Sequence, residues 1–363
     1  MKVVIASGEY PPVVSGISRV ASAVAAGLLA QGHEVRLITA NSGLKRVGRV
    51  AVIDRMGKEI LDNDVDILQI FGPTPIFTEQ CVRYAHKRRI PIVYHLYSLP
   101  GLQTYYDTFL TRAIDRLYET TLLTTALKVI DCAIFTTRDL ANSYTAYSGP
   151  YVVIPHAVPE CKCPLVRFAR VDSDQALAPV RIPSSLLFVG QLRPYKGVSY
   201  LLAAVSTIVA LGHDSVKLTI AGDGPDRQKL ESLTQKLGLG KSVQFVGRVS
   251  DEVLHSLYLT HELLVLPSVS AESFGLVLVE ARKHGMKIVA SDMPGVRELV
   301  RLLGGKIAPR RSPLGLADTV MDSLQAKDPI ANAPPCPLSL LPGDEVLEYL
   351  RVYKRILSES HPS

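Results

Sequence analysis

Short apolar runs alternate with longer amphipathic stretches along most of this chain. The runs are rich in Val, Ile and Leu, which is typical of parallel strands buried on both faces of a sheet. The strands predicted in this way are Val3–Ala6, Val35–Thr39, Ile67–Ile70, Ile92–Tyr94, Val129–Phe135, Tyr151–Ile154, Ser185–Val189, Lys217–Ala221, Val243–Val246, Leu263–Leu266 and Ile288–Ala290. The main helices expected between and after them are Ile17–Ala30, Thr78–Arg89, Gln103–Leu127, Val198–Leu211 and Asp344–Ser358. This alternation predicts an α/β protein with parallel sheets.

Length and composition favour two folded domains. The chain has 363 residues, of which 47% are hydrophobic and 20% charged, as is typical of folded rather than disordered proteins. That length exceeds what one ordinary core accommodates. Residues 159–183 are rich in Pro, Arg and Asp and lack periodicity. We therefore expect a linker or variable loop there, between a domain at 1–158 and a domain at 184–343.

The stretch from Leu263 to Gly285 carries the clearest chemical signal. A short predicted strand ends at Pro267, a polar loop follows, and helical spacing begins at Phe274. The first amides of such a helix, here near Gly275 and Leu276, have no partner within the helix and favour an anion. A glycine at this point also lets a phosphate approach the backbone closely.

Two carboxylates frame this predicted anion site. Glu272 lies in the loop before the helix, and Glu280 lies four residues after Leu276, on the same helical face. A carboxylate among Leu, Val and Ala is costly unless a group hydrogen-bonds to it, and the paired hydroxyls of a ribose would do so. A solvated position for Glu280 and a favourable charge at a helix start for Glu272 explain the same pattern equally well.

A second predicted anion site follows the strand Ser185–Val189. Gly190, Arg193, Lys196 and Gly197 lie between this strand and the next helix, so backbone amides and basic side chains are available together. The loop differs from the P-loop of many nucleotide hydrolases, because no Gly-Lys-Ser/Thr follows at the required spacing.

Taken together, these motifs resemble the signature of glycosyltransferase family 4. The resemblance lies in Glu272 and Glu280 with seven residues between them, and in Phe274-Gly275 two residues after the first glutamate. It implies the GT-B fold, in which two Rossmann-like domains face a cleft for a nucleotide-sugar, and a last helix, within 344–363, that packs back on the first domain. The implied roles are contact with the donor sugar for Glu272, with the ribose for Glu280, and with the distal phosphate for the amides of Gly275 and Leu276.

The resemblance extends to other loops of the second half. It implies that Gly190 and Lys196 bind the donor diphosphate. The family's arginine position is occupied by Gln191, and Arg193 is close enough to replace it. The turn Gly247-Arg248 is implied to lie against the nucleobase.

In the first half, the resemblance covers a glycine loop and a histidine. A glycine pair of the family corresponds to Ser15-Gly16, so Gly16 is implied to let the first helix approach the donor phosphates. A histidine close to the reacting sugar is implied at His95, although counting from Pro91 places it nearer Tyr97. A purely structural role for His95 stays open.

The activity implied is retaining transfer of a hexose-type sugar from a UDP- or GDP-sugar to an acceptor hydroxyl. Lys196 and Arg193 would stabilise the departing diphosphate, and Glu272 and His95 would hold the sugar as its anomeric carbon becomes cationic. The leaving phosphate is thought to accept the acceptor's proton in this family, so no metal and no cofactor are expected. Two alternatives stay open: a sugar-nucleotide 2-epimerase of similar fold, and a sugar-nucleotide-binding subunit without turnover.

The net charge and the cysteine content limit which binding partners and which cell compartment are expected. Lys and Arg number 40 against 34 Asp and Glu, a net charge of +6 that suits anionic small molecules or an anionic membrane surface. Nucleic acid is not expected, because aromatic residues make up only 6% and Trp is absent.

The apolar start of the chain is too short for a signal peptide, and the five cysteines show no metal-ligand spacing. We expect a cytoplasmic protein, with a lipid-linked or polysaccharide-precursor acceptor and peripheral contact with the inner face of the membrane as further hypotheses. The helix Gln103–Leu127 could rest on a bilayer, but a packed core is favoured.

Overall fold

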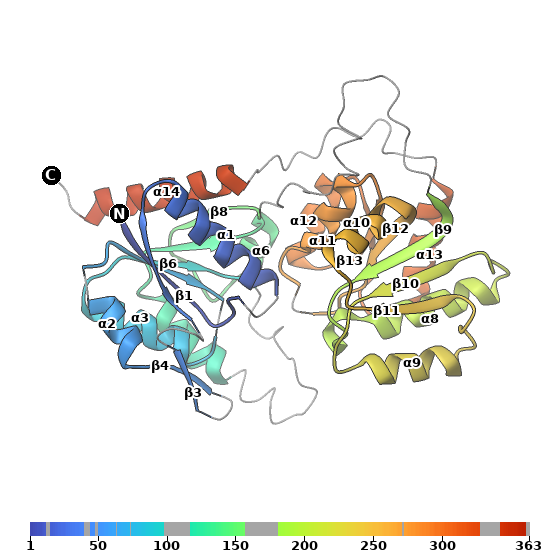
Figure 1. Ribbon diagram of the computed structural model, residues 1–363, viewed down its shortest axis with the longest axis horizontal. Helices are drawn as coiled ribbons and strands as arrows, with labels where there is room; N and C mark the ends of the chain where they lie inside the picture. The colour runs from blue at the N-terminus through green and yellow to red at the C-terminus, as the bar shows by residue number, and fades with distance from the viewer. Residues whose placement is uncertain are drawn as a thin grey trace, which may run out of the picture. The chain divides into compact units, whose positions relative to one another are not determined.

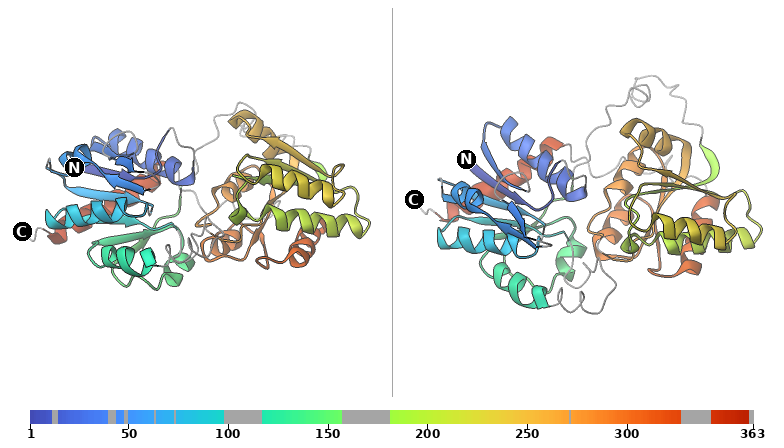
Figure 2. Two further views of the ribbon diagram at one scale, coloured as in Figure 1. Left: turned by 90° about the horizontal axis from the view of Figure 1, so that it is seen from below. Right: turned by 60° about the horizontal axis from the view of Figure 1, so that its bottom comes forward.

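The chain folds into two compact units. One consists of Met1–Ala157 and Leu340–Ser363, and the other of Val158–Ser339 (Figures 1 and 2). The computed structural model describes residues 1–11, 15–39, 44–47, 50–62, 64–72, 74–97, 117–156, 181–270, 272–326 and 342–360.

The first unit is built on a six-stranded parallel sheet with the order β2-β1-β5-β6-β7-β8. Its strands are β1 Lys2–Ser7, β2 Glu34–Ile38, β5 Ile67–Phe71, β6 Ile92–His95, β7 Cys132–Phe135 and β8 Tyr151–Val153. An antiparallel hairpin, β3 Leu44–Val47 and β4 Val50–Ile53, accompanies the sheet. The helical segments are α1 Gly16–Ala30, α2 Arg55–Asp62, α3 Phe77–Lys87, the π-helical turn Glu119–Leu123, α5 Thr124–Leu127, α6 Arg138–Ser143 and α14 Pro342–Ser360.

Both faces of this sheet are covered, which explains why its central strands are largely apolar. Val3 and Ile5 of β1 pack in one core with α1 and α14, whereas Val4 and Ala6 pack in the other core with α3. Successive side chains of a strand point to opposite faces, so a strand covered on both sides needs apolar residues without alternation.

The carboxyl-terminal helix α14 belongs to the first unit. It lies beside α1, and both helices contribute to the same apolar core (Figure 1). Tyr349 and Tyr353 of α14 are fully buried, and the Tyr353 hydroxyl donates a hydrogen bond of 2.9 Å to Oε1 of Gln69 on β5. A segment more than 180 residues away in the sequence from the rest of its unit thus completes one layer of that unit.

The second unit repeats this layered architecture with a parallel sheet of order β11-β10-β9-β12-β13-β14. Its strands are β9 Ile182–Val189, β10 Lys217–Ala221, β11 Val243–Gly247, β12 His261–Leu266, β13 Lys287–Ser291 and β14 Lys306–Ala308. Its helices are the 3₁₀ turn Pro194–Lys196, α8 Val198–Ala210, α9 Arg227–Lys236, α10 Asp251–Thr260, α11 Leu276–Lys283, α12 Pro294–Leu302 and α13 Pro313–Gln325. One face packs against α8, α9 and α13, and the other against α10, α11 and α12.

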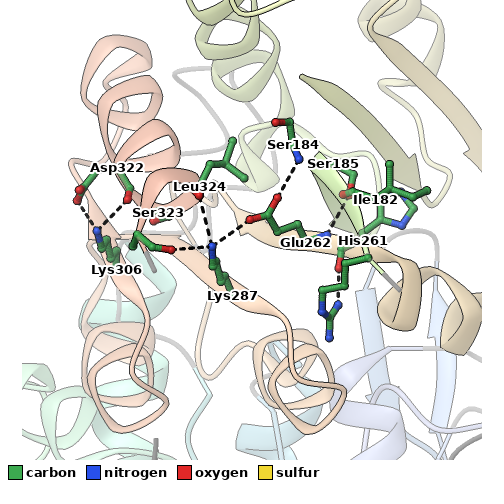
Figure 3. Close-up of polar contacts among 12 residues, drawn as sticks. Ile182, Ser184, Ser185, His261, Glu262, Lys287, Lys306, Asp322, Ser323 and Leu324 are labelled. Carbon is green, nitrogen blue, oxygen red and sulfur yellow. Dashed lines mark hydrogen bonds and ion pairs between the residues drawn. The ribbon is translucent and has the colours of Figure 1, made fainter. Parts of the chain in front are cut away.

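A half-buried ion pair ties the amino ends of the central strands of this sheet together (Figure 3). Lys287, at the start of β13, donates to Oε1 of Glu262 at 3.0 Å and to the carbonyl oxygens of Leu324 and Ala326. The other carboxylate oxygen of Glu262 accepts from the amide of Ser184 at 2.8 Å. Both charges are almost fully satisfied, so we interpret this cluster as structural.

The α/β class with two parallel sheets is therefore confirmed, and the predicted strands are all present, with ends that differ by three residues at most. The hairpin β3–β4 and helix α2 are elements that the sequence pattern did not indicate. The predicted helix Gln103–Leu127 is only partly testable, because residues 103–116 lie outside the described residues. Its last part is helical, with a π-helical turn before α5. Among the helices that the structure describes, none is long and apolar enough to cross a bilayer.

The packing of α14 leads to a stability prediction with a matched control on the same helix. Leu350 is 6% exposed and Leu347 is 43% exposed. Leu350→Ala should lower the free energy of unfolding by about 2–5 kcal/mol, because it removes a buried side chain and leaves a cavity. Leu347→Ala should change it by less than about 0.5 kcal/mol. Urea unfolding followed by circular dichroism measures both, and equal effects of the two variants would refute the packing of α14 described here.

A candidate active site in the second unit

The second sheet has a topological switch point between β9 and β12. From β9 the chain proceeds outward through β10 and β11, and then returns to the other side of β9 for β12, β13 and β14. The two connections therefore leave the carboxyl ends of β9 and β12 in opposite directions. In open parallel sheets, ligands bind in the crevice that forms at such a point. Both loops that the sequence indicated as anion sites, 190–197 and 267–275, begin there.

Lys196 and Glu272, one from each loop, are in direct contact. The Lys196 ammonium donates to Oε2 of Glu272 at 2.6 Å, and their side chains are only 16% and 11% exposed. The Ser268 hydroxyl donates to the same carboxylate oxygen at 2.9 Å. The structure thus joins two candidate residues that are 76 positions apart in the sequence.

The backbones of the two loops are also joined. The amide of Val269 donates to the carbonyl oxygen of Tyr195 at 2.8 Å. Gly197 has a φ of +69°, and a Cβ atom there would lie 2.0 Å from the carbonyl oxygen of Pro267. Only glycine allows this approach, so Gly197 brings the lysine loop against the glutamate loop.

The start of helix α11 has the geometry expected of an anion-binding helix end. Gly275 is its N-cap residue, with a φ of +81°, and as a glycine it offers no side-chain cap to the first amides. Leu276, the first residue of the helix, is half-buried. Phe274 is 2% exposed and packs in the core with Leu278, so its side chain anchors the loop and does not face solvent. The amides that follow Gly275 are therefore the groups of this segment that can bind a phosphate.

Glu280 lies one turn further along α11 and is half-buried. Its Oε2 accepts a hydrogen bond of 2.7 Å from the hydroxyl of Tyr258, which is 1% exposed and comes from α10. Tyr258 thus supplies one of the hydrogen bonds that the half-buried Glu280 carboxylate needs.

The remaining candidates of the second unit lie at the same edge of its sheet. Gly190 follows β9 directly, and its amide donates to the carbonyl oxygen of Ala221 at 3.0 Å. Nε of Arg193 donates to Oε1 of Gln191 at 3.1 Å, so the arginine and the glutamine that occupies the family's arginine position lie together. Gly247, with a φ of +72°, ends β11, and Arg248 after it is exposed.

The two candidate residues of the first unit, Gly16 and His95, lie in different surroundings. Gly16 opens helix α1 and is exposed, and the hydroxyl of Ser15 caps that helix by accepting from the Ser18 amide at 3.1 Å. The serine in place of a glycine is therefore used for capping.

His95 is completely buried in the first unit. Its Nδ1 lies 2.6 Å from the Tyr349 hydroxyl of α14, and its ring stacks on Tyr97 at a centroid distance of 4.3 Å. Burial, followed by the proximity of His156, holds the pKa of His95 well below 6.5, so the imidazole is neutral at pH 7. Its Nε2 and the Tyr97 hydroxyl are buried and have no partner among the described residues. The resemblance implied a place for His95 near the reacting sugar and left a purely structural role open; in the structure its side chain is completely buried within the first unit.

Two residues of the site were not identified from the sequence. Ser268 holds Glu272, and its place directly after the proline that ends β12 is a signal that could have found it. Tyr258 holds Glu280 from another helix, and no sequence spacing connects the two. Among the described residues, no group of three or more His, Cys, Asp or Glu is arranged to hold a metal ion.

Known proteins resemble this chain in sequence. Residues 175–332 match the family model described as glycosyl transferases group 1. An uncharacterized glycosyltransferase of Methanocaldococcus jannaschii is 29% identical over 337 residues, which cover 83% of each chain. A phosphatidyl-myo-inositol mannosyltransferase of Mycobacterium leprae is 34% identical over 147 residues, 40% of this chain and 38% of that protein. The sequence match to this second relative therefore covers well under half of its length.

Solved structures resemble the whole chain in fold. Sucrose-phosphate synthase from Thermosynechococcus elongatus superimposes with a TM-score of 0.66 at 18% identity, covering 99% of this chain and 97% of that one. The Anabaena protein HepE in complex with UDP gives a TM-score of 0.64 at 15% identity, covering 99% and 98%. The match over residues 175–332 and the named relatives identify the chain as a glycosyltransferase. The two parallel sheets with flanking helices, shared with the solved structures, show the GT-B fold.

Proposed function

We propose that this enzyme is a retaining glycosyltransferase of family 4 that transfers a hexose-type sugar from a nucleoside-diphosphate sugar to an acceptor hydroxyl. The observation that carries the proposal is the Lys196–Glu272 ion pair at the switch point of the second sheet, beside the start of α11. A cation suited to a diphosphate and a carboxylate suited to sugar hydroxyls lie next to each other in this pair, which supports the proposal.

The diphosphate is proposed to bind between Lys196 and the first amides of α11. An ammonium has three N–H donors, so Lys196 can keep its bond to Glu272 and still donate to a phosphate oxygen. Arg193 and Gly190 lie on the same loop and would bind the remaining oxygens. These groups would stabilise the negative charge that grows on the diphosphate as it departs. Fixed charges and N–H donors commonly stabilise the transition state of enzymes in this way.

Glu272 is proposed to hold the sugar. Ser268 and Lys196 fix its carboxylate, so it can accept hydrogen bonds from sugar hydroxyls in one orientation while the anomeric carbon gains positive charge. The bond from this carbon to the diphosphate breaks, and the bond to the acceptor oxygen forms on the same face. The proton of the acceptor hydroxyl passes to the leaving phosphate oxygen, so the protein needs no carboxylate pair of the kind used by retaining glycoside hydrolases.

The nucleotide is proposed to be UDP or GDP. Glu280 would accept from the ribose hydroxyls, and the turn Gly247-Arg248 would lie against the base. HepE was solved with UDP, which supports a uridine nucleotide. A relative is named as a mannosyltransferase, so GDP-mannose is kept as the second candidate donor. No metal or cofactor is assigned, because Lys196 and Arg193 supply the positive charge that the diphosphate requires.

The acceptor is proposed to be a hydroxyl of a lipid-linked or polysaccharide precursor. The net charge of +6 and a relative named as acting on phosphatidyl-myo-inositol support a cytoplasmic enzyme in peripheral contact with an anionic membrane. His95 is proposed to position the end of β6 through its bond to Tyr349 rather than to touch the donor, because it is completely buried.

Donor hydrolysis without an acceptor distinguishes the proposal from its alternatives. The transferase should slowly release free sugar from its donor, because water replaces the acceptor. The anomeric proton signal in NMR should show the configuration of the donor retained in the first product. Tight donor binding with no release would instead support a silent binding subunit, and an altered configuration at C2 of intact donor would support an epimerase.

Substitutions in the proposed site should separate binding from turnover. Lys196→Ala and Glu280→Gln should raise the KM for the donor about 10- to 100-fold, because each removes a hydrogen bond to or from a charged group. Glu272→Ala should mainly lower kcat, by about 100-fold or more, because its contacts with the sugar strengthen in the transition state. Lys241→Ala is the matched control, since Lys241 is exposed on the same unit, and it should leave both constants unchanged. Wild-type kinetics in all three site variants would refute the site.

A further inference from the structure

The contact between Tyr258 and Glu280 joins two helices of the second unit. Tyr258 lies in the last turn of α10, and Glu280 lies in α11. The tyrosine ring is buried in the core that α11 forms with the sheet, and its hydroxyl reaches one oxygen of the half-buried carboxylate at 2.7 Å. A phenol that donates to one carboxylate oxygen restricts the rotation of the carboxylate and so fixes the direction of its other oxygen.

A second set of contacts joins the same two helices, next to the Tyr258–Glu280 hydrogen bond. Nδ1 of His284, just after α11, lies 2.7 Å from the carbonyl oxygen of Glu280, so this nitrogen carries the ring proton. Burial lowers the pKa of His284, so its ring is neutral. Nε2 of this ring then accepts a hydrogen bond from Nδ1 of His255 on α10, and the two nitrogens are 3.1 Å apart. The His284 ring also packs against Tyr258 with a centroid distance of 5.2 Å. Tyr258 thus holds the side chain of Glu280, and His255 acts on its backbone only through His284.

Helix α10 also begins at the other end of the proposed nucleotide site. Its N-cap is Ser250, and one residue, Val249, separates it from the turn Gly247-Arg248. One rigid helix therefore connects the turn proposed for the base with the carboxylate proposed for the ribose. A nucleoside needs its base and ribose sites at a constant separation, which a helix between them would maintain.

We propose that Tyr258 is a positioning residue for the donor nucleoside, which orients the Glu280 carboxylate toward the ribose hydroxyls. The proposal rests on the proposed role of Glu280 and extends it to a residue that does not touch the nucleotide. A buried tyrosine whose hydroxyl is satisfied by the nearest carboxylate would show the same contact without any effect on ribose recognition, and the experiment below separates the two.

The test compares ribonucleotides with deoxynucleotides in binding. Titration calorimetry is carried out on the full chain with UDP or GDP, whichever the wild type binds, and with the matching 2′-deoxy and 3′-deoxy nucleotides. The wild type should prefer the ribonucleotide by about tenfold or more, because the deoxy forms lack a hydrogen bond to a charged group. Tyr258→Phe should reduce that preference at least about threefold, with unchanged affinity for the deoxy forms and kcat within about twofold at saturating donor.

Tyr353→Phe is the matched control. It also removes a buried tyrosine hydroxyl that donates to a side-chain oxygen, but in the first unit, far along the chain from the nucleotide site. Both variants should lower the melting temperature to a similar extent, and only Tyr258→Phe should change the ribose preference. An equal loss of preference in both variants would show a general effect of stability and overturn the proposal.

Glu280→Gln distinguishes failure of this inference from failure of the proposed function. If Glu280→Gln loses the ribose preference and Tyr258→Phe keeps it, Tyr258 does not position Glu280, although the ribose assignment stands. If Glu280→Gln keeps the full preference, the ribose assignment itself is wrong and the inference falls with it.

Discussion

The candidate site depends on one ion pair, between Lys196 and Glu272, that joins the loops after β9 and β12. Each charge is largely removed from water, and removing one partner would leave the other buried without compensation. The glycine at 197 and the backbone bond from Val269 to Tyr195 bring the loops close enough for this pair to form. Because the pair sits at the switch point of the sheet, it aligns a cation, a carboxylate and a helix end in one place.

The layered fold could be predicted from the sequence because both sheets are buried on both faces. Strands such as β1 and β12 then contain unbroken apolar runs, Val3–Ala6 and Leu263–Leu266, and such runs are easy to recognise. The hairpin β3–β4 was missed because it is short. Lys45 and Arg46 interrupt its first strand, and the apolar run Val50–Ile53 of its second strand was not recognised as a strand. The packing of α14 on α1 could be expected only from resemblance, since no local pattern indicates which distant helix a helix contacts.

The candidate site was predictable residue by residue, but not as a set of contacts. Lys196 and Glu272 each follow a recognisable strand and glycine loop, yet nothing in the sequence indicates their pairing. Tyr258 could not be found, because its partner lies on another helix. His95 follows a strand as the resemblance requires, but its burial depends on Tyr349, which is 254 residues away. Residue type and order therefore locate a site, whereas tertiary packing decides which side chains are exposed in it.

The most direct test of this account is a crystal structure of the enzyme with UDP or GDP bound. The account predicts that a phosphate oxygen lies within hydrogen-bonding distance of Nζ of Lys196 and that the terminal phosphate faces the first amides of α11. A diphosphate bound away from the carboxyl ends of β9 and β12, with the Lys196–Glu272 pair untouched, would contradict it.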